Sequence, residues 1–522
     1  MAKIVIKITD VFTFILLTGV LFVNMVKFSG YLLGDGKKWI GVAVLAVGVG
    51  VFYFIGGSLF SLLKRLFSFV KKLSVPQMLV ILAAFVLATK VTLVFLLDIN
   101  VNNHNDMRHY MYFAKQIADT GAVTDETLYA TMYPYTVNVS LFLAPWVKLF
   151  GDDPKAVTTL MSILFTLTSL LIFDIARDYI GKNKAFVAVM VYNILPIGLF
   201  QTQVVVHETI LLFLYALSFW LFLKATGDKP YAAGKRLALL LLSSLSIAVG
   251  ANLNAGGYVV MISFVIYAFV KMVQTKLTAK KWLNLLIIVV SLLLCLALVS
   301  GLCSAFVANR VIPGEKESAK VALAQQSRMP MGWITYLGAN YEKQGVWNQE
   351  DYNRYHAFLK CDTPQAARDY QQGLIQDRIS RFTDNPALLP KHFYHKYLEL
   401  WGVPFLGFVY GLGGSHINDI LLYAGNRAIY KGILSLCYLS NILIYSIILF
   451  SYLRRKKKTE TLTVTPELQF KLMLVGIVLS LLLFEMVNKY VSHLHILLMM
   501  LAFFRMDRII GDKHGALKRL RK

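Results

Sequence analysis

The chain has 522 residues, of which 57% are hydrophobic and only 16% are charged. Soluble domains carry roughly 25% charged residues, so this composition, with a mean hydropathy of +0.59, excludes an ordinary soluble protein and predicts a polytopic membrane protein. The net charge of +24 would suggest a nucleic-acid partner in a soluble protein. Here the lysines and arginines stand in short stretches between apolar runs, which is the usual signal of cytoplasmic loops.

Apolar stretches long enough to cross a bilayer recur along the chain. They lie near residues 11–33, 39–61, 77–97, 157–175, 185–203, 207–223, 237–253, 257–273, 283–304, 429–453, 468–487 and 491–504. We therefore predict an all-α polytopic membrane protein with about 12 transmembrane helices and both termini in the cytoplasm. Residues 137–150 are short and carry Pro145 and Lys148, so we expect a helix in the outer interface there.

The basic stretches between the predicted spans indicate which polar segments lie on the same side of the membrane. If these connections are cytoplasmic, the outer side holds residues 98–135, His207-Glu208, residues 252–257, residues 305–401 and residues 488–490. Residues 305–401 form the one substantial polar region, which we expect to fold as a small extracytoplasmic subdomain that closes over a site. The predicted units are an N-terminal two-helix membrane extension (1–76), a core membrane module (77–304) with a catalytic outer loop (98–135), the soluble subdomain (305–401), C-terminal membrane helices (402–504) and a basic cytoplasmic tail (505–522).

The first candidate site follows the third apolar run. Residues 104–110 place two histidines, an arginine and a tyrosine around Asp106. Ionisable residues at the edge of a span are costly and are functional candidates, and a partly desolvated carboxylate can accept a proton from an incoming nucleophile. Two alternatives stay open: a structural pairing of Asp106 with Arg108, and a metal held by His104, Asp106 and Glu208, although these lack the spacing of a zinc motif.

Two further clusters are predicted to face the same side. His207 and Glu208 open a span and would hold an acceptor hydroxyl or amine, or share a cation; the alternative is that Glu208 is an acidic residue favoured in the first turn of a helix. Lys489, Tyr490 and His493 gather hydrogen-bond donors at the outer end of a late span. Such donors suit a phosphate leaving group, and interface anchoring by Lys489 and Tyr490 is the alternative.

The sequence contains no phosphate-binding glycine loop, no dinucleotide-binding turn and no Ser/His/Asp arrangement. The energy for chemistry at the outer surface would therefore come from an activated substrate in the membrane, which points to a lipid-linked donor.

These residues resemble the GT-C superfamily of integral-membrane glycosyltransferases, in the branch of bacterial protein-mannosyltransferase-like and aminoarabinose-transferase-like enzymes. The resemblance runs through Asp106, His109-Tyr110, Tyr133-Pro134-Tyr135, Pro145-Trp146, Gly332-Trp333, Gly338-Ala339-Asn340, Gly345-Val346-Trp347-Asn348, Asn385-Pro386, Lys396, Trp401 and Lys489-Tyr490. It implies a GT-C fold in which Asp106 is catalytic and Glu208 is the second acid. Glu208 replaces the commoner aspartate, and Lys489 replaces an arginine and so lacks its bidentate fork.

The resemblance implies that the protein moves a sugar from a polyprenyl-phosphate donor to an extracytoplasmic acceptor (a cell-envelope polymer, lipid or protein) by an inverting single displacement. The implied roles are catalysis by Asp106 and Glu208, donor-phosphate binding by Lys489, Tyr490 and His493, and acceptor binding or support by His109, Tyr110, Tyr133 and His207. We expect a multi-pass protein of a bacterial plasma membrane, without a nucleic-acid partner and with metal dependence left open. The alternatives are a lipid-linked saccharide flippase or transporter, whose charges would lie mid-span, and a non-catalytic envelope-assembly scaffold.

Overall fold

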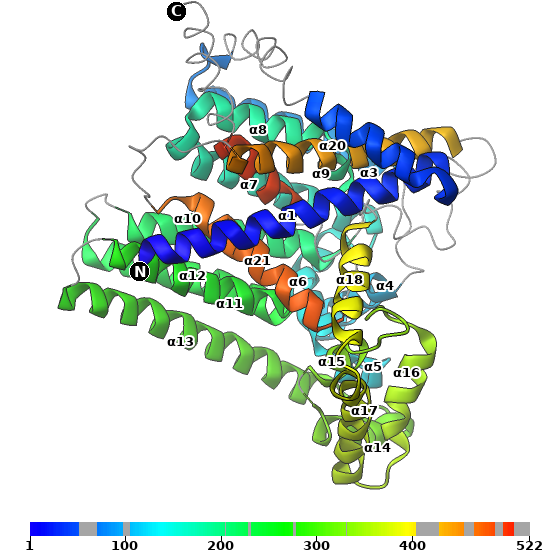
Figure 1. Cartoon of the computed structure of the whole chain (residues 1–522). Helices are drawn as coiled ribbons and strands as arrows, with labels where there is room; N and C mark the ends of the chain where they lie inside the picture. Colours follow the sequence, from blue (N-terminus) through cyan, green and yellow to red (C-terminus); the bar gives the residue numbers. More distant parts are fainter. Residues whose placement is uncertain are drawn as a thin grey trace, which may run out of the picture.

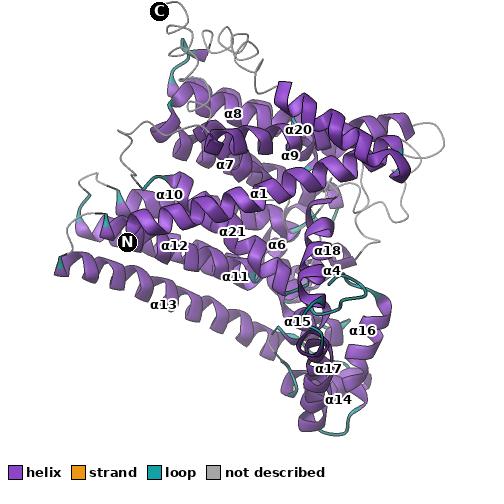
Figure 2. Cartoon of the chain, in the orientation of Figure 1, coloured by secondary structure: helices purple, strands orange, loops and turns teal. Residues whose placement is uncertain are grey.

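Helices make up the regular structure of the described part of the chain in the computed structural model (Figures 1 and 2). The structure describes residues 1–51, 70–97, 105–203, 205–227, 231–274, 278–329, 331–402, 427–453, 464–485 and 494–505. Within these ranges, nine helices are long and apolar enough to cross a membrane. They are α1 (Ala2–Leu33), α3 (Val75–Leu97), α7 (Pro154–Ile180), α10 (His207–Thr226), α11 (Ala233–Leu253), α12 (Gly256–Val273), α13 (Ala279–Arg310), α20 (Arg427–Leu453) and α21 (Pro466–Leu483). The chain is thus an all-α, multi-pass membrane protein, as its composition predicts.

The remaining helices are too short to span a bilayer by themselves, or too polar. They are η1 (Asp35–Lys37), α4 (Asn105–Thr120), α5 (Thr127–Met132), α6 (Pro134–Phe150), α8 (Lys182–Ile194), α9 (Pro196–Phe200), α14 (Glu315–Gln326), α15 (Gly332–Gly338), α16 (Gln349–Tyr355), η3 (His356–Lys360), α17 (Pro364–Asp384) and α18 (Leu388–Gly402). The short helix predicted over residues 137–150 is confirmed as the 17-residue α6, with Pro134 in its first turn.

The continuous span predicted over residues 185–203 is wrong. Helix α8 ends at Ile194, because Leu195 adopts an extended conformation (φ −63°, ψ 142°) before Pro196. The chain restarts as the five-residue α9 and then turns into α10. A proline within an apolar run, which hydropathy alone overlooks, therefore divides this segment.

Helix α1 is joined to the last described helices by a buried network of charges. Asp10 on α1 and Glu467 on α21 lie 2.6 Å and 2.5 Å from the ammonium of Lys471. The guanidinium of Arg505 binds both carboxylates, at 3.1 Å and 2.6 Å, and stacks on Tyr452 of α20. Two cations facing two anions compensate the desolvation of all four groups, so this network fixes the described part of the predicted N-terminal extension to the bundle.

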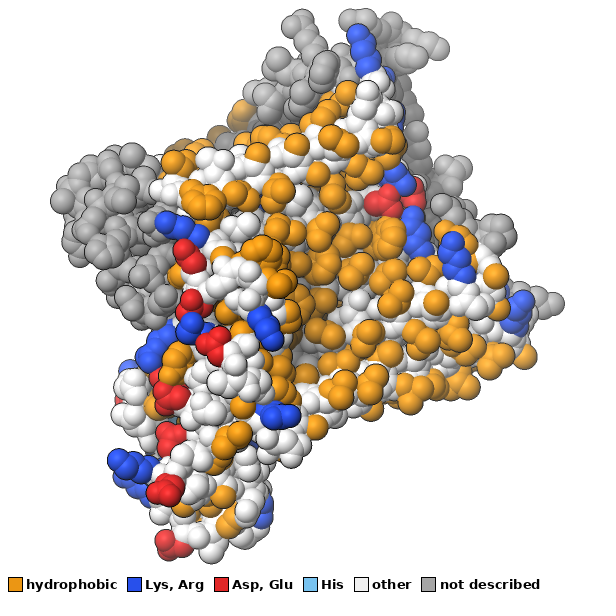
Figure 3. Space-filling model, turned by 180° about the vertical axis from the view of Figure 1, so that it is seen from behind, with side chains coloured by type: hydrophobic (Ala, Val, Ile, Leu, Met, Phe, Trp, Pro, Cys, Tyr) orange, Lys and Arg blue, Asp and Glu red, His pale blue; other side chains and the backbone are white. Residues whose placement is uncertain are grey.

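Helices α14 to α18 form a helical subdomain at one end of the bundle, where α13 reaches it (Figure 1). The predicted start of this region at residue 305 lies within α13, which continues to Arg310. Its own apolar core includes Tyr336, Tyr355, Phe358 and Leu374. In Figure 3, acidic and basic side chains are mixed over this subdomain, while hydrophobic side chains cover the visible face of the bundle. This division is what a lipid-embedded bundle with a solvated subdomain requires.

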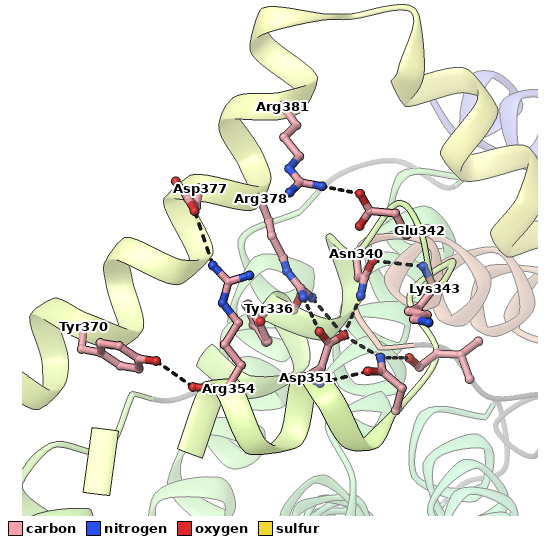
Figure 4. Close-up of polar contacts among 12 residues, drawn as sticks. Tyr336, Asn340, Glu342, Lys343, Asp351, Arg354, Tyr370, Asp377, Arg378 and Arg381 are labelled. Atoms are coloured by element: carbon pink, nitrogen blue, oxygen red, sulfur yellow. Dashed lines mark hydrogen bonds and ion pairs between the residues drawn. The ribbon is translucent and has the colours of Figure 1, made fainter. Parts of the chain in front are cut away.

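A carboxylate at the centre of Figure 4 holds this subdomain together. Asp351 accepts hydrogen bonds from Asn340 and Asn348, each at 2.6 Å, and from Arg378, whose guanidinium also covers the ring of Tyr336. Burial alone would raise the pKa of Asp351, but these hydrogen bonds outweigh it and hold the pKa below its usual value. The cleft of about 380 Å³ beside Asp351 is therefore lined by a network of charges that neutralise one another.

Candidate functional site

Helix α4 carries the predicted catalytic residue at its start. Its apolar positions Met107, Tyr110, Met111 and Ala114 follow the helical spacing of three and four residues and are buried against the bundle. Asp106 stands beside this buried stripe in the first turn of α4, where a carboxylate is stabilised by the helix dipole. The amphipathic pattern of α4 thus lays the helix on the bundle and leaves Asp106 half-buried at its edge.

Two phenols hold the carboxylate of Asp106. Tyr129 of α5 donates to Oδ1 at 3.0 Å, and Tyr135 of α6 donates to Oδ2 at 3.2 Å. Burial raises the pKa of Tyr129, and the neighbouring charge of Asp106 raises it further, so this phenol keeps its proton and donates. Two donors do not use the full acceptor capacity of a carboxylate.

His109 and Arg108 turn to a different carboxylate. Arg108 binds Glu126 at 2.7 Å, and Nδ1 of His109 lies 2.9 Å from the other oxygen of Glu126. The ring of His109 stacks on Tyr129 with centroids 3.7 Å apart. Burial lowers the pKa of His109 and outweighs the opposing effect of Glu126. Arg108 therefore pairs with Glu126, and His109 orients the phenol that binds Asp106.

His207 is fixed by two hydrogen bonds at the start of α10. Nε2 lies 3.0 Å from the side-chain amide of Asn254, whose oxygen accepts from the backbone N–H of Gly256. The amide nitrogen of Asn254 is thus the donor to Nε2, and the ring carries its proton on Nδ1, which lies 2.9 Å from the phenol oxygen of Tyr110. The turn at residues 252–257 sets the tautomer of His207.

Glu208 is a buried acid without a hydrogen-bond donor in the described part of the chain. The residue is 1% exposed, and neither carboxylate oxygen accepts a hydrogen bond from a described group. Nε2 of His207 lies 3.6 Å away. Glu208 lies in the first turn of α10, where acidic residues are favoured, as the alternative interpretation predicts. Burying a carboxylate without a hydrogen-bond donor is nevertheless costly and is typical of a functional position.

Tyr135 connects the Asp106 and His207 clusters. Its phenol binds Asp106, and its ring centroid lies 6.3 Å from that of His207. Tyr133 contacts both neighbouring tyrosines and its hydroxyl lies 2.9 Å from Nε2 of His356 in the subdomain. The fold therefore brings together the predicted residues Asp106, His109, Tyr110, Tyr133, His207 and Glu208.

The sequence interpretation gave no site role to Tyr129, Tyr135, Asn254, His356 and Glu485, although it placed residues 252–257 on the same side and included Tyr135 in the resemblance. The tyrosine-rich run at residues 129–135 was the available signal for the first two. Burial raises the pKa of Tyr133, and the neighbouring groups Tyr352, Glu485 and Asp106 raise it further.

Four predicted site residues, His104, Lys489, Tyr490 and His493, lie outside the described residues. Across the part that the structure describes, no three His, Cys, Asp or Glu side chains converge as metal ligands. The suggested ligand set of His104, Asp106 and Glu208 includes an undescribed residue, so its geometry is not defined.

Long apolar helices, with acids and phenols collected at the end of the bundle that carries the subdomain, define a polytopic membrane protein with a polar site at that end. Residues 136–300 match the sequence model of the dolichyl-phosphate-mannose-protein mannosyltransferase family, a domain of the GT-C superfamily. The match begins in α6 and ends in α13, so it includes His207, Glu208 and Asn254 but not Asp106. No curated protein and no solved structure matches the chain. The family match supports a glycosyltransferase of the GT-C type, in agreement with the resemblance of the sequence.

Proposed function

We propose that the protein transfers a sugar from a polyprenyl-phosphate donor to an acceptor outside the cytoplasm. The observation that carries this proposal is the Asp106 carboxylate, held by two phenols next to the buried pair His207-Glu208. The description of the matched family names a dolichyl-phosphate-linked mannose and a protein acceptor. For this chain we infer the same chemical class of donor, a sugar on a polyprenyl phosphate; the acceptor is a cell-envelope polymer, lipid or protein.

The proposed reaction is an inverting single displacement. The acceptor oxygen attacks the anomeric carbon while its proton passes to Asp106. The bond between that carbon and the phosphate oxygen breaks, and the electron pair leaves with the polyprenyl phosphate. Tyr129 and Tyr135 orient the base without neutralising its charge, so Asp106 remains able to accept the proton.

The other predicted residues take supporting roles in this proposal. Glu208, with its unpaired oxygens, and His207 bind the acceptor, because a hydroxyl or amine donor would supply the hydrogen bond that Glu208 lacks. Lys489, Tyr490 and His493 stabilise the negative charge of the leaving phosphate. The site faces outward in a bacterial plasma membrane, where the basic connections lie on the opposite side.

The test is a transfer assay in purified membranes with radiolabelled polyprenyl-phosphate sugars, beginning with the mannose form. Asp106→Asn keeps the size of the side chain and removes the base. We expect it to lower the transfer rate by about 10²–10⁴-fold, the usual contribution of a general base. Asp119→Asn is the matched control, because Asp119 lies on α4 and is 61% exposed beside Lys115.

Loss of transfer in folded Asp106→Asn, with normal transfer by Asp119→Asn, supports the proposal. Equal rates in Asp106→Asn and the wild type would refute the catalytic role of Asp106. Failure of the wild type to transfer sugar from any polyprenyl-phosphate donor would refute the function itself.

A further inference from the structure

Lys396 is a buried cation at a junction of three elements. Its ammonium, on α18, donates to the backbone carbonyl of Gly338 at 3.1 Å and to that of Phe484 at 2.6 Å. Nε2 of His392, one turn earlier on α18, donates to the same Gly338 carbonyl at 2.8 Å. Lys396 thus links α18, the end of α15 in the subdomain, and the residue directly after α21.

Packing alone does not account for a lysine at this position. The side chain is 0% exposed, and no described carboxylate lies within ion-pair distance of it. An apolar residue would fill the space without the cost of burying an ammonium group. Burial lowers the pKa of Lys396 to about 7, and the nearby carboxylate of Glu485 opposes that change. The ammonium of Lys396 supplies donors to two carbonyls from different elements at once.

Two glycines allow the close approach of backbone at this junction. A Cβ on Gly338 would lie 2.6 Å from the carbonyl oxygen of Leu483, and a Cβ on Gly345 would lie 2.9 Å from Cε of Lys396. Gly345 also has a positive φ of 76°, which favours glycine. The backbone of the subdomain therefore packs directly against the end of α21. The ammonium of Lys396 joins the two by hydrogen bonds to both backbones.

The junction leads directly to the proposed site. Trp333, on the same α15 as Gly338, packs against His356 with ring centroids 5.0 Å apart, and Nε2 of His356 lies 2.9 Å from the hydroxyl of Tyr133. Tyr133 in turn contacts Tyr129 and Tyr135, the two donors to Asp106. Lys489 and Tyr490, which we propose to bind the donor phosphate, follow Glu485 in the sequence.

We propose that Lys396 is a positioning residue for sugar transfer: it fixes α15 and the end of α21 against α18, so that α15, through His356 and Tyr133, holds the phenols that bind the Asp106 carboxylate. This inference rests on the proposed function. Lys396 touches neither substrate nor reacting atom; it acts through the backbone carbonyls of Gly338 and Phe484.

The test compares Lys396→Met, Lys396→Arg and the control Lys391→Met, which removes an exposed lysine from the same helix. The assay uses polyprenyl-phosphate mannose as the donor probe and expresses kcat per folded molecule, with folded protein measured by size-exclusion chromatography. We expect Lys396→Met to lower kcat by about tenfold or more, as misplaced catalytic groups do. Lys396→Arg keeps the cation and its donors and should recover most of the rate, whereas Lys391→Met should match the wild type.

A purely structural role for Lys396 would reduce the yield of folded protein and leave kcat per folded molecule within twofold of the wild type. That result overturns the proposal. If Lys396→Met does not accumulate, Lys396→Gln, which loses the charge but keeps one donor group, replaces it in the same comparison.

Hydrogen exchange separates failure of this inference from failure of the proposed function, because it needs no substrate. In Lys396→Met, the amides of residues 480–484 and 337–340 should exchange faster than in Lys391→Met. Unchanged exchange would show that Lys396 does not hold α15 and the end of α21 together, even if the enzyme transfers sugar. A wild type that transfers no sugar refutes the proposed function, and the exchange result then decides on the junction alone.

Discussion

The carboxylate of Asp106 accepts hydrogen bonds from two neutral phenols. The arginine nearest to it in the sequence binds a different carboxylate. Arg108 binds Glu126, while Tyr129 and Tyr135 donate to Asp106. A guanidinium at this position would stabilise the carboxylate strongly and reduce its ability to take a proton. Phenols fix the orientation of the carboxylate at a smaller cost in basicity, which suits a general base.

Removal of one of these phenol donors should impair the proposed reaction. In Tyr135→Phe we expect kcat/KM to fall by about 10- to 100-fold, because a hydrogen bond to a charged group contributes about 1.5–3 kcal/mol. The measurement is the membrane transfer assay with polyprenyl-phosphate mannose. Tyr231→Phe is the control, since Tyr231 lies before α11 and contacts Lys235. Equal kinetics for Tyr135→Phe and the wild type would contradict the assigned role of Tyr135.

At the scale of elements, the subdomain is bonded to the loop that carries the site. The carboxylate of Glu317 on α14 accepts from the hydroxyl of Thr127 at 2.5 Å and from the backbone N–H of Leu128 at 3.3 Å, at the start of α5. His356 of η3 meets Tyr133, which follows α5. Helix α5 thus lies between the subdomain and Asp106, so movement of the subdomain would move the donor Tyr129.

The contact between His356 and Tyr133 should weaken in acid. Burial lowers the pKa of His356 to about 4, against the opposing hydrogen bond of its ring to the carbonyl of Tyr352. An unfolded histidine has a pKa of about 6.5, so the unfolded chain binds the extra proton first as the pH falls below this value. The stability present above pH 6.5 is therefore lost as the pH falls toward 4, by roughly 2–3 kcal/mol.

Urea unfolding in detergent at pH 7 and pH 4.5, followed by tryptophan fluorescence, measures this loss. Trp333, whose ring centroid lies 5.0 Å from that of His356, reports on the junction. In His356→Gln, the decrease in stability between the two pH values should be smaller than in the wild type, because the titrating group is absent. The same decrease in both proteins would show that His356 does not titrate in this manner.

At the scale of the whole molecule, charge and hydropathy set an orientation in the membrane. Figure 3 shows hydrophobic side chains over the visible face of the bundle and charged ones toward its ends and over the subdomain. The positive-inside rule predicts that the basic connections lie in the cytoplasm and the subdomain outside. This orientation determines which acceptors reach the site.

Cysteine labelling tests the orientation. In a Cys361→Ser background, Asp377→Cys adds a thiol to the subdomain at a position that is 75% exposed, and Lys235→Cys adds one at the exposed start of α11. We expect a membrane-impermeant maleimide to label Asp377→Cys in intact cells, and Lys235→Cys only after permeabilisation. The opposite pattern would invert the topology and place the site in the cytoplasm.

The sequence by itself determined the class of fold and predicted the central acids of the proposed site. Composition and apolar runs are properties of the local chain, and a bilayer allows few backbone solutions besides the helix, so hydropathy was sufficient to predict an all-α multi-pass protein. Asp106 and Glu208 were predicted as site residues because ionisable groups at the ends of apolar runs are costly wherever the chain then goes. The break at Pro196 was missed because hydropathy averages over a window and ignores backbone restriction.

Only the tertiary structure decided the partners of these acids. Tyr129, Tyr135 and His207 reach the site from three different helices, and Lys396 binds carbonyls that are 58 and 88 residues away in the sequence. No local periodicity encodes such contacts, because they depend on how helices cross and on which side chains remain after the apolar faces are buried. The identity of the acids therefore follows from local energetic cost, whereas their orientation follows from packing between distant segments.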